Sequence, residues 1–437
     1  MRKLITVIGT TGVGKSKLSV TLARALNGEV INGDSMQVYH GLDTITNKHP
    51  IEEQFDIPHH LLGHETDRSQ EYTIHRFEKE VEEKVISISD RMKVPILVGG
   101  THYYIQSVLF KNRTVTELQK RALSSEEEYF MDTAETKDIF ERLRQADPSI
   151  ASKFHPRDRR KLRTALTMYF TTGLKPSDIY RSQKEDPKSD SRYKSLVFWV
   201  WSDQTMLDKR LDMRVDKMIQ EGNMLDEIKE MSDLYKSLEP KPIMENGIWQ
   251  VIGFKEFLPY IDSLNHENRD TALDEVKKNT RKYARTQVKW IRRKFLVAAK
   301  ECPEDVVVVL LNATDLSKWE IDVENPAIAI AKDFLNDIQT QQNIRAPYDL
   351  QHLLQAAQEK DNSAQPEDWQ HFKCDICKDK FGDAFVCVGS ERWKIHLNSR
   401  KHKQFIRYLS KKSEFEKWNS GRKSKDDAKK LSSTKLL

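Results

Sequence analysis

The chain has 437 residues, of which 38% are hydrophobic and 32% charged, and its formal net charge is +5. A chain of this length holds two or three domains, and no apolar run approaches the ~20 residues that a membrane-spanning helix needs. Three of the four cysteines lie between residues 374 and 387, which favours a metal site in a reducing compartment over a disulfide framework. The first strand begins at Leu4, which leaves no room for a signal or transit peptide. We expect a cytoplasmic protein without a membrane partner, and the nucleus and mitochondria stay open as further locations.

The N-terminus carries a phosphate-binding motif. An apolar, β-branched run at residues 4–8 predicts a buried strand, and Gly9-Thr-Thr-Gly-Val-Gly-Lys15-Ser16 follows it directly, with helical spacing of apolar residues behind it. This is the context in which G-x-x-x-x-G-K-[ST] forms a P-loop. Loop N–H groups, the helix N-terminus and Lys15 attract an anion, and Ser16 can take a Mg²⁺ ligand position. The sequence therefore predicts a site for a diphosphate or triphosphate, the alternative being a glycine-rich turn that matches by chance.

Two more buried strands are predicted at residues 30–31 and 94–98, with an amphipathic helix over residues 73–92 between them. Strand ends in an open parallel sheet line the ligand crevice, so Asp34 should lie near the P-loop. It is either a turn former or a catalytic or Mg²⁺-linked carboxylate. NTP-hydrolysing P-loop proteins commonly hold Mg²⁺ with an acidic residue at such a strand end. Gly99 and Gly100 stand there instead, which argues against an ATPase motor.

Residues 111–190 are helical, charged and poor in β-branched runs, which predicts an inserted helical domain. A strand at residues 196–201 returns to the core, and the next helix places Arg210 and Arg214 on one face. This arginine pair either clamps a phosphate or pairs with acidic neighbours on the surface, and the periodicity does not decide between the two.

The C-terminal half contains two basic stretches, at residues 277–294 and 392–430, interleaved with Tyr and Trp. Such a pattern is typical of nucleic-acid binding, and its alternative is a solvated helix face. Between the stretches, residues 306–311 predict the last core strand, and residues 337–368 are polar enough to form a linker.

The tail carries Cys374-x2-Cys377 and then His396-x5-His402. Thiolates and imidazoles in this order form a tetrahedral Zn²⁺ site. The stretch between the two pairs is longer than the usual dozen residues of such fingers, so Cys387 or His371 is an alternative ligand.

The predicted fold class is α/β: a P-loop parallel-sheet core with an inserted helical domain and a C-terminal C2H2-type zinc finger. The predicted domains are residues 1–110 (first part of the core), 111–190 (helical insertion), 191–336 (second part of the core, with the basic helix), 337–368 (linker), 369–410 (finger) and 411–437 (basic tail).

Together these motifs resemble the tRNA dimethylallyltransferases, also known as tRNA isopentenyltransferases, from Leu4 to about Arg293, and the finger extends the resemblance to the eukaryotic branch. The segments that carry it, besides the P-loop, are Val30-Ile-Asn-Gly-Asp-Ser-Met-Gln-Val-Tyr39, Ile57-Pro-His-His-Leu61, Val98-Gly-Gly-Thr-His-Tyr-Tyr104, Leu211-Asp-Met-Arg-Val-Asp216 and Ile252-Gly-Phe-Lys-Glu256.

The resemblance implies transfer of a dimethylallyl group from dimethylallyl diphosphate to N6 of the adenosine at tRNA position 37, with Mg²⁺ as cofactor, structural Zn²⁺ in the finger, and the anticodon stem-loop of tRNA as partner of a monomer. It implies catalytic roles for Thr11, Asp34 and Arg214. The diphosphate would be bound by Thr11, Gly12, Val13, Gly14, Lys15, Ser16 and Arg214. The tRNA would be contacted by Asp34, Ser35, Met36, Gln37, Thr101, Arg160, Lys161, Arg163, Ile252, Gly253, Phe254, Lys255, Arg281, Arg285 and Lys289.

The chain departs from the family pattern at two places that concern tRNA contacts. The second basic position of the basic helix in the insertion has moved by one, with Thr164 after Arg163, and Thr286 stands where the family often has Arg. Neither change touches the catalytic set.

Two other functions fit parts of the sequence. A P-loop nucleoside or nucleotide kinase explains the P-loop, with Asp34 as base, but leaves the basic C-terminal half and the finger without a role. A non-catalytic RNA-binding protein with a P-loop fits poorly with the intact Lys15 and Ser16.

Overall fold

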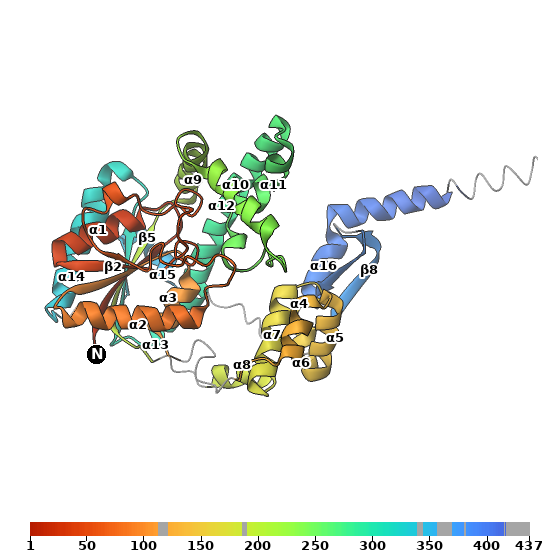
Figure 1. The fold of residues 1–437 in the computed structure, drawn as a ribbon, viewed down its shortest axis with the longest axis horizontal. Helices are drawn as coiled ribbons and strands as arrows, with labels where there is room; N and C mark the ends of the chain where they lie inside the picture. The colour runs from red at the N-terminus through yellow and green to blue at the C-terminus, as the bar shows by residue number, and fades with distance from the viewer. Residues whose placement is uncertain are drawn as a thin grey trace, which may run out of the picture. The chain divides into compact units, whose positions relative to one another are not determined.

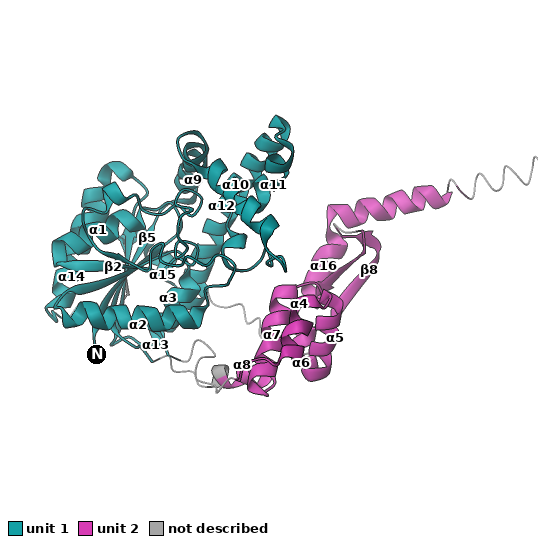
Figure 2. Cartoon of the chain, viewed as in Figure 1, with its two compact units in different colours: residues 1–117, 186–359 teal, residues 118–185, 360–437 magenta. Residues whose placement is uncertain are grey.

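The computed structural model describes residues 1–111, 121–185, 190–338, 344–355, 369–379, 382–414 and 416. The chain divides into two compact units, each made of two segments (Figure 2): unit 1 holds residues 1–117 and 186–359, and unit 2 holds residues 118–185 and 360–437. Most of the predicted basic tail and residues 356–368 of the predicted linker lie outside the described residues. Among the described helices, none combines the length and apolar character that crossing a bilayer requires.

Unit 1 is built on a parallel sheet whose strand order is β3-β2-β4-β1-β5-β6-β7 in the part of the chain that the structure describes (Figure 1). The central strands are apolar on both faces, as expected for a parallel sheet that is covered on both sides. The strands are β1 (Lys3–Gly9), β2 (Gly28–Asn32), β3 (His59–His60), β4 (Val94–Val98), β5 (Lys194–Trp201), β6 (Val306–Asn312) and β7 (Ile344–Arg345). The predicted α/β class is confirmed.

Two apolar clusters, one on each face, bury the sheet. On one face the strands pack with α1 (Lys15–Leu26), α9 (Gln204–Gln220) and α14 (Asn325–Leu335). On the other they pack with α2 (Ile74–Asp90), α3 (His102–Leu109) and α13 (Leu296–Glu301). The remaining elements of unit 1 are α10 (Met224–Ser237), α11 (Phe254–Ser263), α12 (His266–Trp290) and α15 (Gln351–Leu354), the 3-10 turns Ile51–Glu53, Gly247–Gln250, Leu316–Lys318 and Tyr348–Leu350, and the π-helical turns Ile291–Phe295 and Glu320–Glu324.

The predicted linker is wrong over residues 344–354, and β6 is not the last strand of the sheet. Ile344 and Arg345 form β7, which pairs in parallel with β6 at Val308 and Val309. The segment that follows buries leucines in the core of unit 1: Leu350, Leu353 and Leu354. A two-residue strand followed by polar residues gives no period-2 signal, which is why the sequence pattern missed it.

Unit 2 contains the predicted helical insertion and the predicted finger. The insertion is α4 (Ser125–Thr133), α5 (Thr136–Ala146), α6 (Pro148–Lys153), α7 (Arg159–Thr172) and α8 (Pro176–Glu185) around its own apolar cluster. The finger is the antiparallel pair β8 (His371–Lys378) and β9 (Ala384–Val388), then α16 (Ser390–Asn398), with residues 400–414 helical again.

The finger packs against the start of the basic helix within unit 2. His371 Nε2 donates a hydrogen bond to the Phe154 carbonyl at 2.9 Å, and His155 Nε2 donates one to the Val386 carbonyl at 3.0 Å. Arg157 forms ion pairs with both Asp379 and Asp383 of the hairpin. The insertion and the finger, far apart in sequence, therefore share one compact unit.

Candidate active site

The glycine-rich loop (residues 9–16) joins β1 to α1 and leaves the first N–H groups of that helix free of a side-chain cap. Gly14 has φ 95°, in the left-handed region that favours glycine, and a Cβ built on it would lie 2.6 Å from the Trp319 ring. Lys15 lies at the helix start and donates from Nζ to the Thr10 carbonyl at 2.8 Å. Uncapped N–H groups at a helix N-terminus form an anion site, so the geometry agrees with the predicted phosphate cradle.

Thr11 is held from two sides. Its hydroxyl accepts a hydrogen bond from Arg214 Nη1 at 2.9 Å, and its N–H donates to Gln287 Oε1 at 2.9 Å. The structure therefore brings Arg214 to the loop, while Arg210, four residues earlier, donates to the carbonyls of Ala313 and Thr314 instead. The two arginines do not act as a pair: one reaches the loop and the other supports the segment after β6.

The cations of the site are uncompensated in the absence of an anion. Burial lowers the pKa of Lys15 to about 8, and the neighbouring Arg214 lowers it further while Asp34 opposes the shift. Burial also lowers the pKa of Arg214 to about 10, and its Nε is buried without a hydrogen-bond partner. A bound diphosphate would stabilise both charged forms and supply acceptors for the unpaired N–H.

Asp34 follows β2 at the carboxyl edge of the sheet, beside the loop. Its Oδ1 accepts from the Met36 N–H at 3.0 Å, and burial raises the pKa of its carboxyl despite this bond and the charge of Lys15. Gly100, at the exit of β4, marks where the groups meet: a Cβ there would lie 2.7 Å from Gln287 Nε2, 3.3 Å from Asp34 Oδ2 and 3.8 Å from Lys15 Nζ. Glycine at this strand end thus leaves room for the three side chains.

Residues predicted to contact tRNA form a continuous edge around Asp34. The Ser35 N–H and hydroxyl both lie within hydrogen-bond distance of Thr101 Oγ1, at 3.1 and 3.2 Å. Gln37 Nε2 donates to the carbonyls of Thr46 and Asn47, at 3.1 and 2.9 Å. The ends of β2 and β4 are therefore tied together by polar side chains next to the glycine-rich loop.

The predicted tRNA contacts near α11 are divided by burial. Phe254 is completely buried in the core, which corrects the prediction that its side chain contacts tRNA. Gly253 and the half-buried Ile252 precede it at the helix start, and Lys255 pairs with Glu245 at 2.7 Å. The Phe254 ring packs in the core because it lies among Tyr235 and Trp249.

The basic helix α12 does not expose all of its predicted RNA-binding cations. Arg281 forms an ion pair with Asp212, and Arg285 with Asp208, both on α9. Lys289, farther along, is exposed. In unit 2, Arg163 bonds the Met131 carbonyl and Asp132, Lys161 pairs with Asp158, and Arg160 is exposed.

The finger assembles the predicted metal ligands. The ligand atoms of Cys374, Cys377, His396 and His402 all lie within 4.8 Å of one another. His396 Nε2 is buried without a hydrogen-bond partner, as expected for an atom that faces a metal. Two thiolates and two imidazoles at this spacing are compatible with tetrahedral zinc. Cys387 is not part of the set.

Sequence reasoning missed three residues of the site. Gln287 bridges two backbones, since its Nε2 also donates to the Gly100 carbonyl at 2.9 Å. Trp319 covers Gly14, and Lys17 Nζ lies 5.1 Å from the centre of its ring. Burial lowers the pKa of His102 to about 3, so a neutral imidazole lies near Lys15. A polar Gln on the apolar side of a basic helix was the one available signal.

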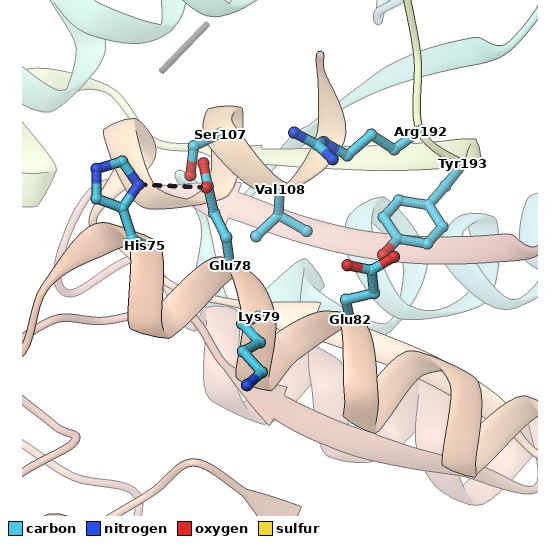
Figure 3. Close-up of a pocket in the computed structure, with 8 residues that line it drawn as sticks. All are labelled: His75, Glu78, Lys79, Glu82, Ser107, Val108, Arg192 and Tyr193. Atoms are coloured by element: carbon cyan, nitrogen blue, oxygen red, sulfur yellow. Dashed lines mark ion pairs between the residues drawn. The ribbon is translucent and has the colours of Figure 1, made fainter. Parts of the chain in front are cut away.

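A separate half-open pocket of about 230 Å³ lies between α2, the end of α3 and the residues before β5 (Figure 3). Its charged lining includes Glu78 and His75, which form an ion pair at 3.8 Å, and Arg192. None of the residues predicted for catalysis or binding lines this pocket, so it is not the candidate active site.

The sheet, the loop and its cations define an α/β protein with a phosphate site after its first strand. The IPP transferase family model matches residues 37–294. The chain is 41% identical to the tRNA dimethylallyltransferase of Saccharomyces cerevisiae, over 97% of this chain and 96% of that protein. It is 32% identical to that of Homo sapiens, over 91% and 85%. A solved structure described as eukaryotic dimethylallyltransferase acting on tRNA matches with a TM-score of 0.77 at 41% identity, over 96% of this chain and 100% of that one. The chain belongs to the tRNA dimethylallyltransferase family.

Proposed function

We propose that this chain transfers a dimethylallyl group from dimethylallyl diphosphate to N6 of the adenosine at position 37 of tRNA, beside the anticodon, and releases diphosphate. One observation carries the proposal: a carboxylate, Asp34, and two cations, Lys15 and Arg214, meet at one edge of the sheet where β4 ends in glycines. This edge offers a base and an anion site together. The family membership supports the substrates.

The proposed chemistry needs one proton acceptor and one stabilised leaving group. The allylic C–O bond of dimethylallyl diphosphate breaks, its electron pair leaves with the diphosphate, and the N6–C1 bond forms. Asp34 accepts the N6 proton as that bond forms. Because N6 is stacked in the anticodon loop, the adenosine has to leave the stack to reach Asp34.

The departing diphosphate carries the developing negative charge. Loop N–H groups, Lys15 and Arg214 are arranged before the reaction starts, so they stabilise this charge without reorganising. Thr11 contributes through its hydroxyl, since its N–H is bonded to Gln287. Ser16 opens α1 with a hydroxyl that suits a Mg²⁺ ligand position, and Mg²⁺ there would add charge stabilisation when bound.

For the finger we propose structural Zn²⁺ on Cys374, Cys377, His396 and His402, and contact with the phosphates of the anticodon stem-loop. We further propose a monomer that acts in the cytoplasm. The family membership does not support a kinase or a non-catalytic RNA-binding protein.

The test of the proposed function compares two donors. Radiolabel from dimethylallyl diphosphate should enter tRNA in the presence of Mg²⁺, at an adenosine identified by nucleoside digestion. Labelled ATP should transfer nothing, and ATP hydrolysis should stay at background with and without tRNA. A robust tRNA-stimulated ATPase would overturn the transferase assignment.

Diphosphate affinity should depend on pH through Lys15. Its folded pKa of about 8 lies below the ordinary 10.5, so the cation is present below pH 8 and is lost as pH rises through that value. We expect affinity for dimethylallyl diphosphate to fall by about tenfold per pH unit above this point. Calorimetric titrations on both sides of pH 8 measure it. Lys15→Ala should bind weakly and without this pH dependence, and an unchanged wild-type affinity through pH 8 would contradict the linkage.

The finger should contribute tRNA affinity through its metal. Cys374→Ser removes one ligand, so bound zinc should fall from one equivalent toward zero and tRNA affinity should weaken. The slope of log affinity against log salt should flatten by about 0.7–0.9 for each phosphate that the finger no longer neutralises. Cys387→Ser, the same change in the same hairpin, should keep the metal because Cys387 is outside the ligand set. If Cys374→Ser bound tRNA with the wild-type affinity and salt slope, the finger would serve another purpose.

A further inference from the structure

Helices α9 and α12 are joined by three ion pairs in a row. Asp208, Asp212 and Asp216 recur every four residues on α9, and Lys277, Arg281 and Arg285 recur every four residues on α12. Their pairing runs in opposite directions along the two helices: Asp208 with Arg285, Asp212 with Arg281, and Asp216 with Lys277. Residues four apart share a helix face, so two antiparallel faces of opposite charge meet. We refer to these six residues as the ion-pair ladder.

The ladder lies directly behind the contacts that hold Thr11. Arg214 stands on α9 between Asp212 and Asp216, and its Nη1 donates to the Thr11 hydroxyl at 2.9 Å. Gln287 stands on α12 two residues after Arg285, and its Oε1 accepts from the Thr11 N–H at 2.9 Å. The two joined helices thus reach the same residue of the glycine-rich loop, one through its side chain and one through its backbone.

We propose that the six ladder residues are positioning residues, which hold α9 against α12 so that Arg214 stays on Thr11 and faces the diphosphate. Arg281 and Arg285 act through α9 in this assignment, in place of the direct tRNA contacts predicted from the sequence. The inference rests on the proposed function for the identity of the anion, but the geometry of the ladder does not depend on it.

Exposure limits what the ladder contributes to folding. The six side chains are between 19% and 49% exposed, and ion pairs at such positions contribute little to global stability. Their effect is geometric instead. A shift of α9 by about 1 Å would break a 2.9 Å hydrogen bond from Arg214, and misplacements of that size cost catalysis up to about 100-fold.

Charge reversal separates positioning from the two competing explanations. Asp212→Arg and Arg281→Asp each place like charges opposite one another, and the double variant restores an ion pair in reversed order. If the ladder positions Arg214, both single variants weaken binding of dimethylallyl diphosphate, and the double variant recovers it. A pure field effect predicts opposite signs instead, because Asp212→Arg adds positive charge near the anion and Arg281→Asp removes it. A direct RNA contact predicts that Arg281→Asp weakens tRNA binding and that Asp212→Arg does not rescue it.

The experiment measures dimethylallyl diphosphate affinity, tRNA affinity and thermal unfolding for the wild type and the three variants. We expect each single variant to bind dimethylallyl diphosphate about 10- to 100-fold more weakly. The double variant should return to within about threefold of wild type, with tRNA affinity and the unfolding temperature nearly unchanged throughout. Asp212→Glu, which keeps the charge, should behave like the wild type.

The matched control is the exchange of Glu275 and Lys278, an exposed ion pair at 2.7 Å within α12 alone. The single and double variants of this pair should leave diphosphate affinity unchanged, because they do not touch α9. Opposite-sign effects of the two ladder variants, or failure of the double variant to recover, would overturn the proposal. A wild-type protein that did not bind dimethylallyl diphosphate would instead overturn the proposed function.

Discussion

Asp34→Asn should lower the single-turnover rate by about 10²–10⁴ at saturating substrates, while tRNA affinity stays nearly unchanged. The amide keeps the size of the side chain and an oxygen that accepts from the Met36 N–H, a bond of 3.0 Å in the structure. The substitution removes the ability to accept the N6 proton. The measurement is a rapid-quench single-turnover assay beside a filter-binding assay for tRNA.

The pH profile provides the control for this variant. Burial raises the pKa of the Asp34 carboxyl, so the wild-type rate should fall as pH drops through a pKa above the ordinary 3.8 for aspartate. The residual rate of Asp34→Asn should lack that acid limb, because no carboxylate titrates at the site. Near wild-type turnover with an unchanged profile would reduce Asp34 to a structural turn residue.

Arg214→Gln should lower the single-turnover rate by about 10²–10³, since it removes a preorganised donor and a full charge from the leaving diphosphate. Dimethylallyl diphosphate should also bind more weakly, because Arg214 is largely buried beside Lys15 and has an unpaired Nε. Titration calorimetry and the single-turnover rate separate the loss in binding from the loss in the chemical step.

Arg210→Gln is the matched control for this change. It lies one turn earlier on α9 and bonds the Ala313 and Thr314 carbonyls, so removing it costs packing after β6 and leaves the bond between Arg214 and Thr11 in place. Its rate at saturating substrates should stay within a few-fold of wild type. Equal losses in the two variants would indicate a general dependence on helix α9 in place of a specific role for Arg214.

The local parts of the site were readable from the sequence because their signals are local. Glycines, Lys15 and Ser16 directly after a β-branched run define the loop by themselves. The nearness of Asp34 to it followed from a rule about strand ends in parallel sheets. The metal ligands were readable for a similar reason, since two short-range pairs specify them.

The remaining parts depend on contacts between distant residues, which periodicity does not encode. Phe254 lies in a motif that resembles tRNA-contacting segments, yet its ring is core. Arg281 and Arg285 have the composition of an RNA-binding face, yet their partners are carboxylates on another helix. Gln287 gained its role only when α12 met the glycine-rich loop, 276 residues away in sequence.

The finger and the helical insertion also imply an order of events during synthesis. The Arg157–Asp379 and His155–Val386 contacts join residues 222 and 231 positions apart. At about 5–20 residues per second on the ribosome, the insertion emerges roughly 10–45 s before the hairpin that packs on it. Strands β5 and β6, needed to finish the sheet of unit 1, are made during that interval. Nascent chains therefore pass through a stage in which the docking surface at the start of α7 waits for its partner, and a chaperone able to cover that surface would act within this interval.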